Sequence, residues 1–342
     1  MANMKDVAKL AGVSVSTVSH IINGTRFVKE DTKNRVMDAI RQTGYIHNTI
    51  ARSLVTSSTQ TIGLAISAIS NFYFADIIAA IERSARASGH TLLLADTHDD
   101  LDEELRVVQA LHQRRVDGVL LATAGDADSE SLQYLQDLGV PTVLVDRCAS
   151  TKFDQVGTEN IEATAELTGH LTEHGHQRIG LIAGRELLRT TVERERGWRL
   201  GLQRANLKPD RRLVASGQSS ADFAEAAVER LLSEPDPPTA LVVANNHMTI
   251  GVMSALTRLG VSVPDDLALA VFDDFEWANY FHPRLTAMAQ PIGDIGACAI
   301  ETLLSRIADP KRPTTTVQLP ATFKRRESCG CQAPTRPAKE QP

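Results

Sequence analysis

The stretches Met4-Lys-Asp-Val-Ala-Lys-Leu-Ala-Gly-Val-Ser14 and Ser16-Thr-Val-Ser-His-Ile-Ile-Asn23 decide the fold of the N-terminal part of the chain. Val7, Leu10 and Ala11 recur at helical spacing and predict one apolar helix face. The apolar positions of the second stretch repeat in the same way. The pattern therefore predicts two short helices close together in the chain.

A break and a capping residue separate these two helices. Gly12-Val13-Ser14 interrupts the first, and Ser14 is suited to cap a second helix that ends near Asn23-Gly24. A third helix ends at Gly44, a natural left-handed cap. The predicted inward residues of the second and third helices are Val18, Ile21, Ile22, Val36, Ala39 and Ile40. This is the plan of a helix-turn-helix DNA-binding unit, although a small three-helix bundle of another purpose fits the composition equally well.

The distribution of charge favours a DNA-binding unit over a three-helix bundle of another purpose. The whole chain of 342 residues has a net charge of −6. Residues 1–60 contain eight Lys and Arg but only four acidic residues, a net +4, so the remaining residues carry −10. A basic segment on an acidic body is typical of a protein in which one module meets phosphates, although a charge of +4 also fits a solvated surface.

The rest of the composition is that of an ordinary globular protein, with 42% hydrophobic and 23% charged residues. No apolar run is long enough to span a bilayer and the start is no secretory signal, so we expect a cytoplasmic, nucleoid-associated protein without a membrane partner. Metal is not expected. Cys329-Gly-Cys331 is one residue short of a C-x-x-C pair, and no Cys or carboxylate completes a ligand set with His170, His174 and His176.

From Thr61 the pattern alternates between strand and helix. The predicted strands are near-continuous apolar runs: 62–66, 91–95, 118–122, 142–146, 179–183, 240–244 and 267–272. Such repeats predict parallel sheets covered by helices on both faces, here as two doubly wound lobes with a ligand crevice beyond the strand ends. Asp146, Asn245, Asn246, Asp273 and Asp274 follow strands and would face that crevice. No G-x-G-x-x-G or P-loop follows any strand, which argues against a Rossmann enzyme or NTPase.

The two quoted stretches, with Gly44-Tyr-Ile-His-Asn48 and Ala51-Arg-Ser-Leu54, closely resemble the head of LacI/GalR-type bacterial repressors, nearest the ribose/purine branch. The resemblance covers residues 1–331. It implies a helix-turn-helix domain (1–47), a hinge helix and linker (48–60) and a two-lobed periplasmic-binding-protein-like body (61–331). The Pro- and charge-rich composition of residues 332–342 predicts a disordered tail. Lobe one would comprise about 61–160 plus 291–331, and lobe two about 161–290, with three crossings between them.

The family resemblance also implies how DNA is read. The second helix enters the major groove, and a hinge leucine wedges between central base pairs in the minor groove. The implied DNA-binding residues are Val15, Ser16, Thr17, Ser19, His20, Asn23, Asn48, Ala51, Arg52 and Leu54, with Leu54 as the wedge. His47 replaces the family's proline before the hinge asparagine, and Lys29 takes a capping position that favours Ser or Thr.

The effector would be a small molecule held between the lobes. By resemblance its ligands are Asp146, Arg194, Asn245 and Asp273, with Tyr73 or Phe74 lining the site, and Gln218 and Trp277 as further candidates. Carboxylates and amides suit sugar hydroxyls, and aromatic faces suit a sugar ring. The arginines at 185, 189, 194 and 196 would also suit an anionic effector, so a sugar acid or sugar phosphate stays an alternative to a neutral sugar. A purine is disfavoured, because Leu188 stands where the purine-repressor branch has arginine.

These features predict a cytoplasmic homodimeric repressor that binds a double-stranded DNA operator. A tetramer stays open, although no heptad tail follows Cys331. A free-standing sugar-binding protein would need a signal peptide and no head, and an enzyme would need a catalytic motif. We expect neither catalysis nor a cofactor.

Overall fold

The computed structural model describes residues 2–23, 26–45, 58–69, 71–280 and 282–331. The chain divides into two compact units, Met1–Thr59 and Gln60–Pro342. None of the described helices has the length and apolar character needed to cross a bilayer.

The first unit contains three helices, α1 (Met4–Ala11), α2 (Val15–Asn23) and α3 (Glu30–Thr43). Asn3 and the side chain of Asp6 form a capping box at the start of α1. The fully or almost fully buried side chains that join the helices are Val7, Ala8, Ala11, Val18, Val36 and Ala39. Leu10 was predicted to face inward but is 53% exposed, whereas Ala8, which the pattern did not mark, is buried beside Val7 and Ala11.

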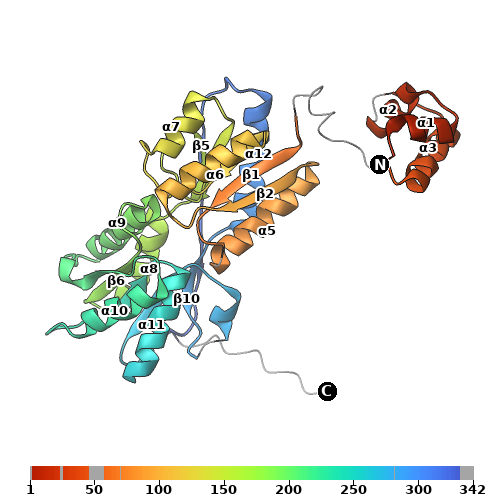
Figure 1. The fold of residues 1–342 in the computed structure, drawn as a ribbon. Coiled ribbons are helices and arrows are strands. Elements are labelled where there is room, and N and C mark those ends of the chain that lie inside the picture. The colour runs from red at the N-terminus through yellow and green to blue at the C-terminus, as the bar shows by residue number, and fades with distance from the viewer. Residues whose placement is uncertain (1, 24–25, 46–57, 70, 281, 332–342) are drawn as a thin grey trace, which may run out of the picture. The chain divides into compact units, whose positions relative to one another are not determined.

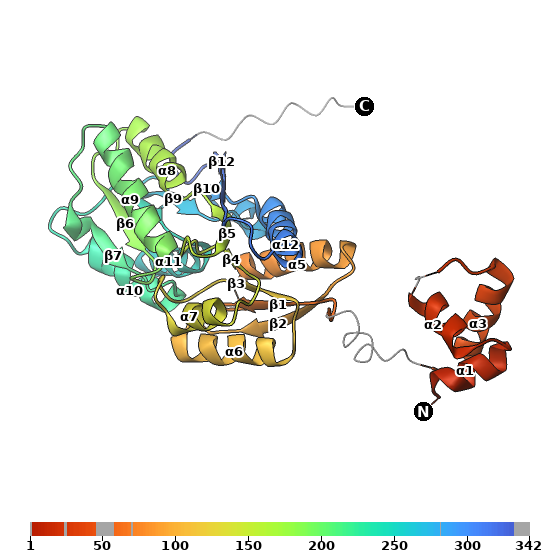
Figure 2. The same cartoon turned by 90° about the horizontal axis from the view of Figure 1, so that it is seen from above.

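The second unit consists of two lobes, each built on one six-stranded sheet (Figures 1 and 2). The first sheet has the order β11-β5-β4-β3-β1-β2 and the second β12-β10-β9-β8-β6-β7. All described strand pairs are parallel except β10 with β12. The strands are β1 (Thr61–Ile66), β2 (Thr91–Asp96), β3 (Gly118–Leu121), β4 (Thr142–Val145), β5 (Asp154–Thr158), β6 (Ile179–Ala183), β7 (Val214–Ser216), β8 (Ala240–Val243), β9 (Ala268–Phe272), β10 (Thr286–Ala289), β11 (Thr316–Leu319) and β12 (Thr322–Lys324).

Helices cover both faces of each sheet, as predicted for doubly wound lobes. In lobe one, α5 and α12 cover one face and α6 and α7 the other (Figure 2), and each face has its own apolar cluster. In lobe two, α8 packs on α9 and α10 on α11. The helices are α5 (Phe72–Ala87), α6 (Leu101–Gln113), α7 (Glu130–Asp137), α8 (Ile161–Glu173), α9 (Arg189–Arg204), α10 (Ala221–Leu232), α11 (Asn246–Leu259) and α12 (Ile292–Ala308), with short 3-10 helices at Arg211–Leu213 and Glu276–Asn279.

The chain crosses between the lobes three times, between β5 and α8, between β10 and α12, and between β11 and β12. The predicted division of the lobes was wrong at the last crossing. We expected 291–331 to belong wholly to lobe one, but β12 pairs with β10 in the second sheet, and Cys329 is part of the lobe-two core. The antiparallel pairing of this short segment draws the end of the described chain onto lobe two.

Candidate functional site

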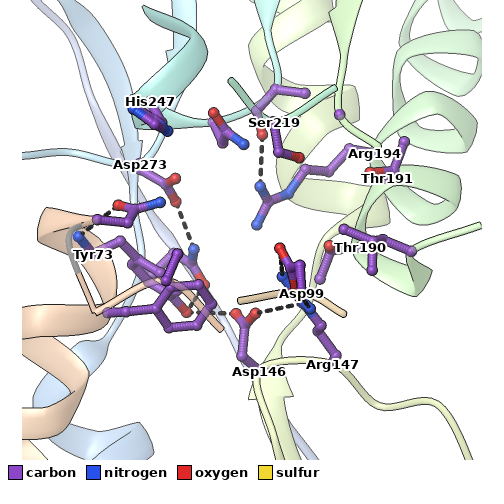
Figure 3. Close-up of a pocket in the computed structure, with 18 residues that line it drawn as sticks. Tyr73, Asp99, Asp146, Arg147, Thr190, Thr191, Arg194, Ser219, His247 and Asp273 are labelled. Atoms are coloured by element: carbon purple, nitrogen blue, oxygen red, sulfur yellow. Dashed lines mark hydrogen bonds and ion pairs between the residues drawn. The ribbon is translucent and has the colours of Figure 1, made fainter. Parts of the chain in front are cut away.

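A small cavity lies between the two lobes, where the carboxyl ends of strands from both sheets meet (Figure 3). Its volume is about 70 Å³. Residues of both lobes line it: Ala68, Asn71, Tyr73, Phe74, Asp99, Asp146, Arg147, Gly184, Leu188, Thr190, Thr191, Arg194, Ser219, Ala244, Asn245, His247, Asp273 and Gln290. This is the crevice that the strand-end argument predicts for doubly wound lobes.

Tyr73 and Asp146 form the lobe-one side of the cavity. The Asn71 side chain caps α5 by accepting a hydrogen bond of 3.0 Å from the Tyr73 backbone N–H. The Tyr73 hydroxyl donates to Asp146 Oδ1 at 2.6 Å. Burial raises the pKa of both side chains, that of Tyr73 well above its usual value, and the negative charge of Asp146 adds to the shift at Tyr73. Tyr73 therefore stays a neutral hydrogen-bond donor at physiological pH.

Asp273 lies opposite, directly after β9, in left-handed backbone conformation with φ 76°. Its Oδ2 accepts from the Asn246 backbone N–H at 3.1 Å, and its Oδ1 accepts from Gln290 Nε2 at 2.6 Å. Asp is among the few residues besides glycine that tolerate this backbone conformation. The carboxylate is thus fixed by two donors and is 4% exposed.

Gln290 connects the two sides. It follows β10 at the second crossing, and its Oε1 accepts from Thr158 Oγ1 at 2.5 Å and lies 3.0 Å from the Tyr73 hydroxyl. Its amide nitrogen donates to Asp273. One side chain therefore joins Tyr73 and Thr158 of lobe one to Asp273 of lobe two.

A second buried carboxylate–guanidinium pair lies in lobe one. Asp99 accepts from Arg147 Nη1 at 2.5 Å and from Nη2 at 3.3 Å, and Arg147 also donates to the Thr123 carbonyl at 3.0 Å. Burial alone would raise the pKa of Asp99, but the charge and hydrogen bonds of Arg147 hold it below its usual value. Arg185 of lobe two donates to the Asp99 carbonyl at 2.6 Å and so links the lobes at the rim of the cavity.

Arg194 is the only one of the four arginines between 185 and 196 that is buried. Its Nε donates to Asn160 Oδ1 at 2.9 Å and its Nη1 to the Ala244 carbonyl at 2.6 Å. Its guanidinium lies 3.8 Å from the centroid of the Phe272 ring. The exposed Arg189 pairs instead with Glu193. The arginine-rich stretch therefore contributes one cation to the cavity.

Six of the eight effector residues predicted from the sequence line the cavity: Tyr73, Phe74, Asp146, Arg194, Asn245 and Asp273. Gln218 and Trp277 do not. The amide of Gln218 donates to Ser216 Oγ at 2.9 Å, and the residue lines an open groove beside the cavity, where Ser219 reaches inward instead. Trp277 packs on Phe275, with ring centroids 3.6 Å apart.

Other lining residues were missed by the sequence argument. They are mainly polar: Asn71, Asp99, Arg147, Thr190, Thr191, Ser219, His247 and Gln290. Asp99 follows β2 and Gln290 follows β10. The strand-end rule that placed Asp146 also applies to the loop after β2, which contains Asp99, but no strand was predicted at 286–289, so the rule did not reach Gln290. Asp274 satisfies that rule but turns away and pairs with Arg326 at 2.9 Å.

In the first unit, α2 presents a polar face. Val15 and Ser16 are exposed, and Thr17, Ser19 and His20 are half-buried. Ser14 caps the helix as predicted, since its Oγ accepts from the Thr17 backbone N–H at 3.1 Å. Lys29 makes no side-chain capping bond at the start of α3.

Five further residues predicted to bind DNA cannot be placed. The side chain of Asn23 and the whole of Asn48, Ala51, Arg52 and Leu54 lie outside the described residues. The contacts implied for them therefore remain predictions.

Two family models match the chain. Residues 3–48 match the model of bacterial regulatory proteins of the lacI family, and residues 168–329 match a periplasmic binding protein-like domain. The HTH-type transcriptional repressor PurR of Aliivibrio salmonicida (strain LFI1238) is 36% identical over 311 residues, which cover 90% of this chain and 93% of that protein.

Two solved structures extend the likeness over almost the whole chain. The Lac repressor dimer bound to operator and the anti-inducer ONPF has a TM-score of 0.87 at 27% identity, covering 96% of this chain and 99% of that one. The complex of the transcriptional regulator CelR with cellobiose has a TM-score of 0.73 at 30% identity, covering 96% and 100%. The chain belongs to the LacI family of bacterial regulatory proteins, and it is a DNA-binding transcriptional repressor with a body that binds a small-molecule effector.

Proposed function

We propose that the effector is a neutral sugar or sugar derivative, bound in the cavity between the lobes. The observation that carries this proposal is the convergence of three carboxylates, Asp99, Asp146 and Asp273, with the aromatic side chains of Tyr73 and Phe74. Carboxylates accept hydrogen bonds from hydroxyl groups, and aromatic faces pack against the apolar face of a sugar ring.

The charge of the lining favours a neutral ligand over a sugar acid or sugar phosphate. Three aspartates and two arginines line the cavity, which gives a formal charge of −1. Both cations are already engaged, Arg147 by Asp99 and Arg194 by Asn160, the Ala244 carbonyl and the Phe272 ring. Neither guanidinium is a free fork for an anion.

A purine is the second candidate, because relatives such as the Aliivibrio protein are named PurR. Leu188 argues against it. This side chain lines the cavity, is 4% exposed, and stands where the purine-repressor branch has an arginine. The CelR–cellobiose complex, by contrast, is a regulator of similar structure with a sugar bound.

Binding of such an effector would change the angle between the lobes. The cavity of about 70 Å³ is well below the roughly 300 Å³ at the small end of ligand pockets. A sugar therefore requires the lobes to move apart, against the cross-lobe bonds Arg185–Asp99 and Asn246–Asn71. A hinge motion of this kind is a common way for a ligand to switch a two-lobed protein.

DNA would be read by two heads of a homodimer on a pseudo-palindromic operator. Val15 and Ser16, both exposed, and His20 are proposed to read the major groove. Leu54 is proposed to wedge into the minor groove, with Asn48, Ala51 and Arg52 beside it. The dimer is supported by the similar Lac repressor, solved as a dimer on operator. A tetramer is left open, and operator binding would place the protein in the cytoplasm with the nucleoid.

A thermal-shift screen tests the effector class. The full chain is heated with neutral sugars, sugar acids, sugar phosphates and nucleobases, since a ligand bound only by the native state raises its apparent stability. We expect stabilisation by a neutral sugar, and loss of that stabilisation in Asp273→Asn. Stabilisation by nucleobases alone would refute the sugar proposal, and stabilisation by anionic sugars alone would refute the argument from charge.

A further inference from the structure

Two histidines and two cysteines that are far apart in the sequence meet on the surface of lobe two. His170 belongs to α8 and His174 caps its end, while Cys329 and Cys331 follow β12. The ligand atoms of the four side chains all lie within 4.8 Å of one another. From the sequence alone, neither the two histidines nor the two cysteines formed a complete set of metal ligands. The third crossing between the lobes brings the two pairs together.

The distances fit a single tetrahedral ion. His170 Nε2 lies 3.2 Å from Cys329 Sγ and 3.4 Å from Cys331 Sγ, and His174 Nε2 lies 3.1 Å from Cys331 Sγ. With zinc bond lengths of about 2.3 Å to sulfur and 2.0–2.1 Å to nitrogen, tetrahedral geometry separates sulfur from nitrogen by about 3.6 Å. Small side-chain shifts would therefore suffice to place an ion at the centre.

The neighbouring hydrogen bonds orient the ligand atoms toward this centre. His174 Nδ1 lies 2.8 Å from the His170 carbonyl, which can only accept, so Nδ1 carries the proton and the lone pair of Nε2 points at Cys331. Ligating histidines are commonly held in this way. The Thr286 hydroxyl donates to Cys329 Sγ at 3.1 Å.

Several short contacts converge in the cluster. Three of them join sulfur to imidazole nitrogen, and Cys329 Sγ also lies 3.5 Å from the Arg326 carbonyl. One cation would satisfy all four ligand atoms at once.

The backbone and the exposure of the cluster suit an ion that enters from solvent. Gly330 has φ 87°, a left-handed conformation that allows both flanking cysteines to reach the same helix. His170 and Cys329 are buried, Cys331 is half-buried and His174 is exposed. The site therefore has an anchored inner side and an open outer side.

We propose that these four side chains bind one Zn²⁺-type divalent ion in a structural site. Two sulfur and two nitrogen ligands in tetrahedral arrangement are typical of zinc. The ion would fasten the segment after β12 to α8 and so anchor the end of the described chain on lobe two. The cluster is made only of lobe-two residues and is independent of the effector cavity.

Cobalt(II) is the probe for this site. The full chain, reduced and freed of metal with a chelator, is titrated anaerobically with Co²⁺ and then with Zn²⁺. We expect one Co²⁺ per chain, with thiolate-to-cobalt charge-transfer absorption and the intense ligand-field bands of a tetrahedral site, both displaced by Zn²⁺. Zn²⁺ should also raise the melting temperature.

Matched variants distinguish the cluster from other thiols and imidazoles. Cys331→Ser and His174→Ala should weaken the affinity for metal at least about tenfold, while circular dichroism shows that the fold is kept. The controls are Cys298→Ser, another half-buried thiol, and His176→Ala, whose Nδ1 lies 3.0 Å from Thr239 Oγ1. Both controls should bind metal like the parent chain.

Two outcomes would overturn the proposal. One is a reduced chain that takes up no Co²⁺, or takes it up equally well after Cys331→Ser. The other is a disulfide between Cys329 and Cys331 that persists under the reducing conditions of the titration.

Discussion

Gln290→Met tests the bridge between the two sides of the cavity. Methionine keeps the length of the side chain but removes both polar atoms of the amide. Asp273 Oδ1 would lose its 2.6 Å donor and Thr158 Oγ1 its 2.5 Å acceptor, whereas the Tyr73 hydroxyl keeps its bond to Asp146. The variant therefore removes one bond to a charged group and one between neutral groups.

The expected loss follows from these two bonds. A hydrogen bond to a charged group contributes about 1.5–3 kcal/mol and a neutral one about 0.5–1.5 kcal/mol, so the free energy of unfolding should fall by about 2–4 kcal/mol. For a body of this size the melting temperature should drop by roughly 5–10 °C. Effector affinity should weaken by about tenfold, because Asp273 loses the donor that orients it.

Gln155→Met is the matched control. Gln155 is also buried and makes two hydrogen bonds, from Ser150 N at 3.0 Å and to Thr316 Oγ1 at 2.9 Å, but both lie within lobe one. Gln155→Met should lower the melting temperature by an amount comparable to Gln290→Met and leave effector affinity unchanged. Calorimetric unfolding and titration calorimetry measure both quantities. If the two variants weakened effector binding equally, or Gln290→Met left it intact, the bridge would have no role in the site.

Three further predictions address the cavity, the hinge and the acid stability of lobe one. Asp273→Ala should abolish the effector response while operator affinity without effector stays nearly intact, and unaltered effector affinity in titration calorimetry would remove Asp273 from the site. Leu54→Ala should weaken specific operator binding by roughly 1–3 kcal/mol, with little change in non-specific binding; unchanged specific affinity and DNA bending would make residues 48–54 a plain linker. Burial alone would raise the pKa of the Asp154 carboxyl group, but hydrogen bonds from Arg306 and Thr315 lower it. The stabilisation that the ionised carboxylate gives the folded state should therefore be lost as the pH falls below about 4. Asp154→Asn should remove that part of the acid dependence in denaturant titrations, and an identical acid profile would contradict the assignment.

Local pattern was enough to predict the regular part of the fold. The strands with continuous apolar runs and the three head helices lie where periodicity places them. Five strands were not predicted: β5, β7, β10, β11 and β12. None of them is a continuous apolar run of four or more residues, and β7 and β12 have only three residues each. Leu10 shows the limit of this prediction within a helix. The spacing of apolar residues identifies one face of the helix, but it does not show which edge of that face is buried.

The site was predictable to the extent that it follows from strand ends. Asp146 and Asp273 follow β4 and β9 and face the cavity, as this rule requires. Gln290 depends on a crossing between lobes, and the partners of His170 depend on where β12 pairs. Contacts of this kind join residues more than 100 positions apart, and no local pattern encodes them.

The three crossings also determine the order in which the lobes can be completed during synthesis. After β5 leaves the ribosome, about 160 residues follow before β11 pairs with it, which takes roughly 8–30 s at ~5–20 residues per second. Until α12 and β11 emerge, the first sheet lacks the helix that covers Ile77 and Ile81 and exposes β5 as an unpaired edge. A nascent chain of this protein therefore carries an unpaired strand edge and an uncovered apolar helix face while nearly half its length is synthesised.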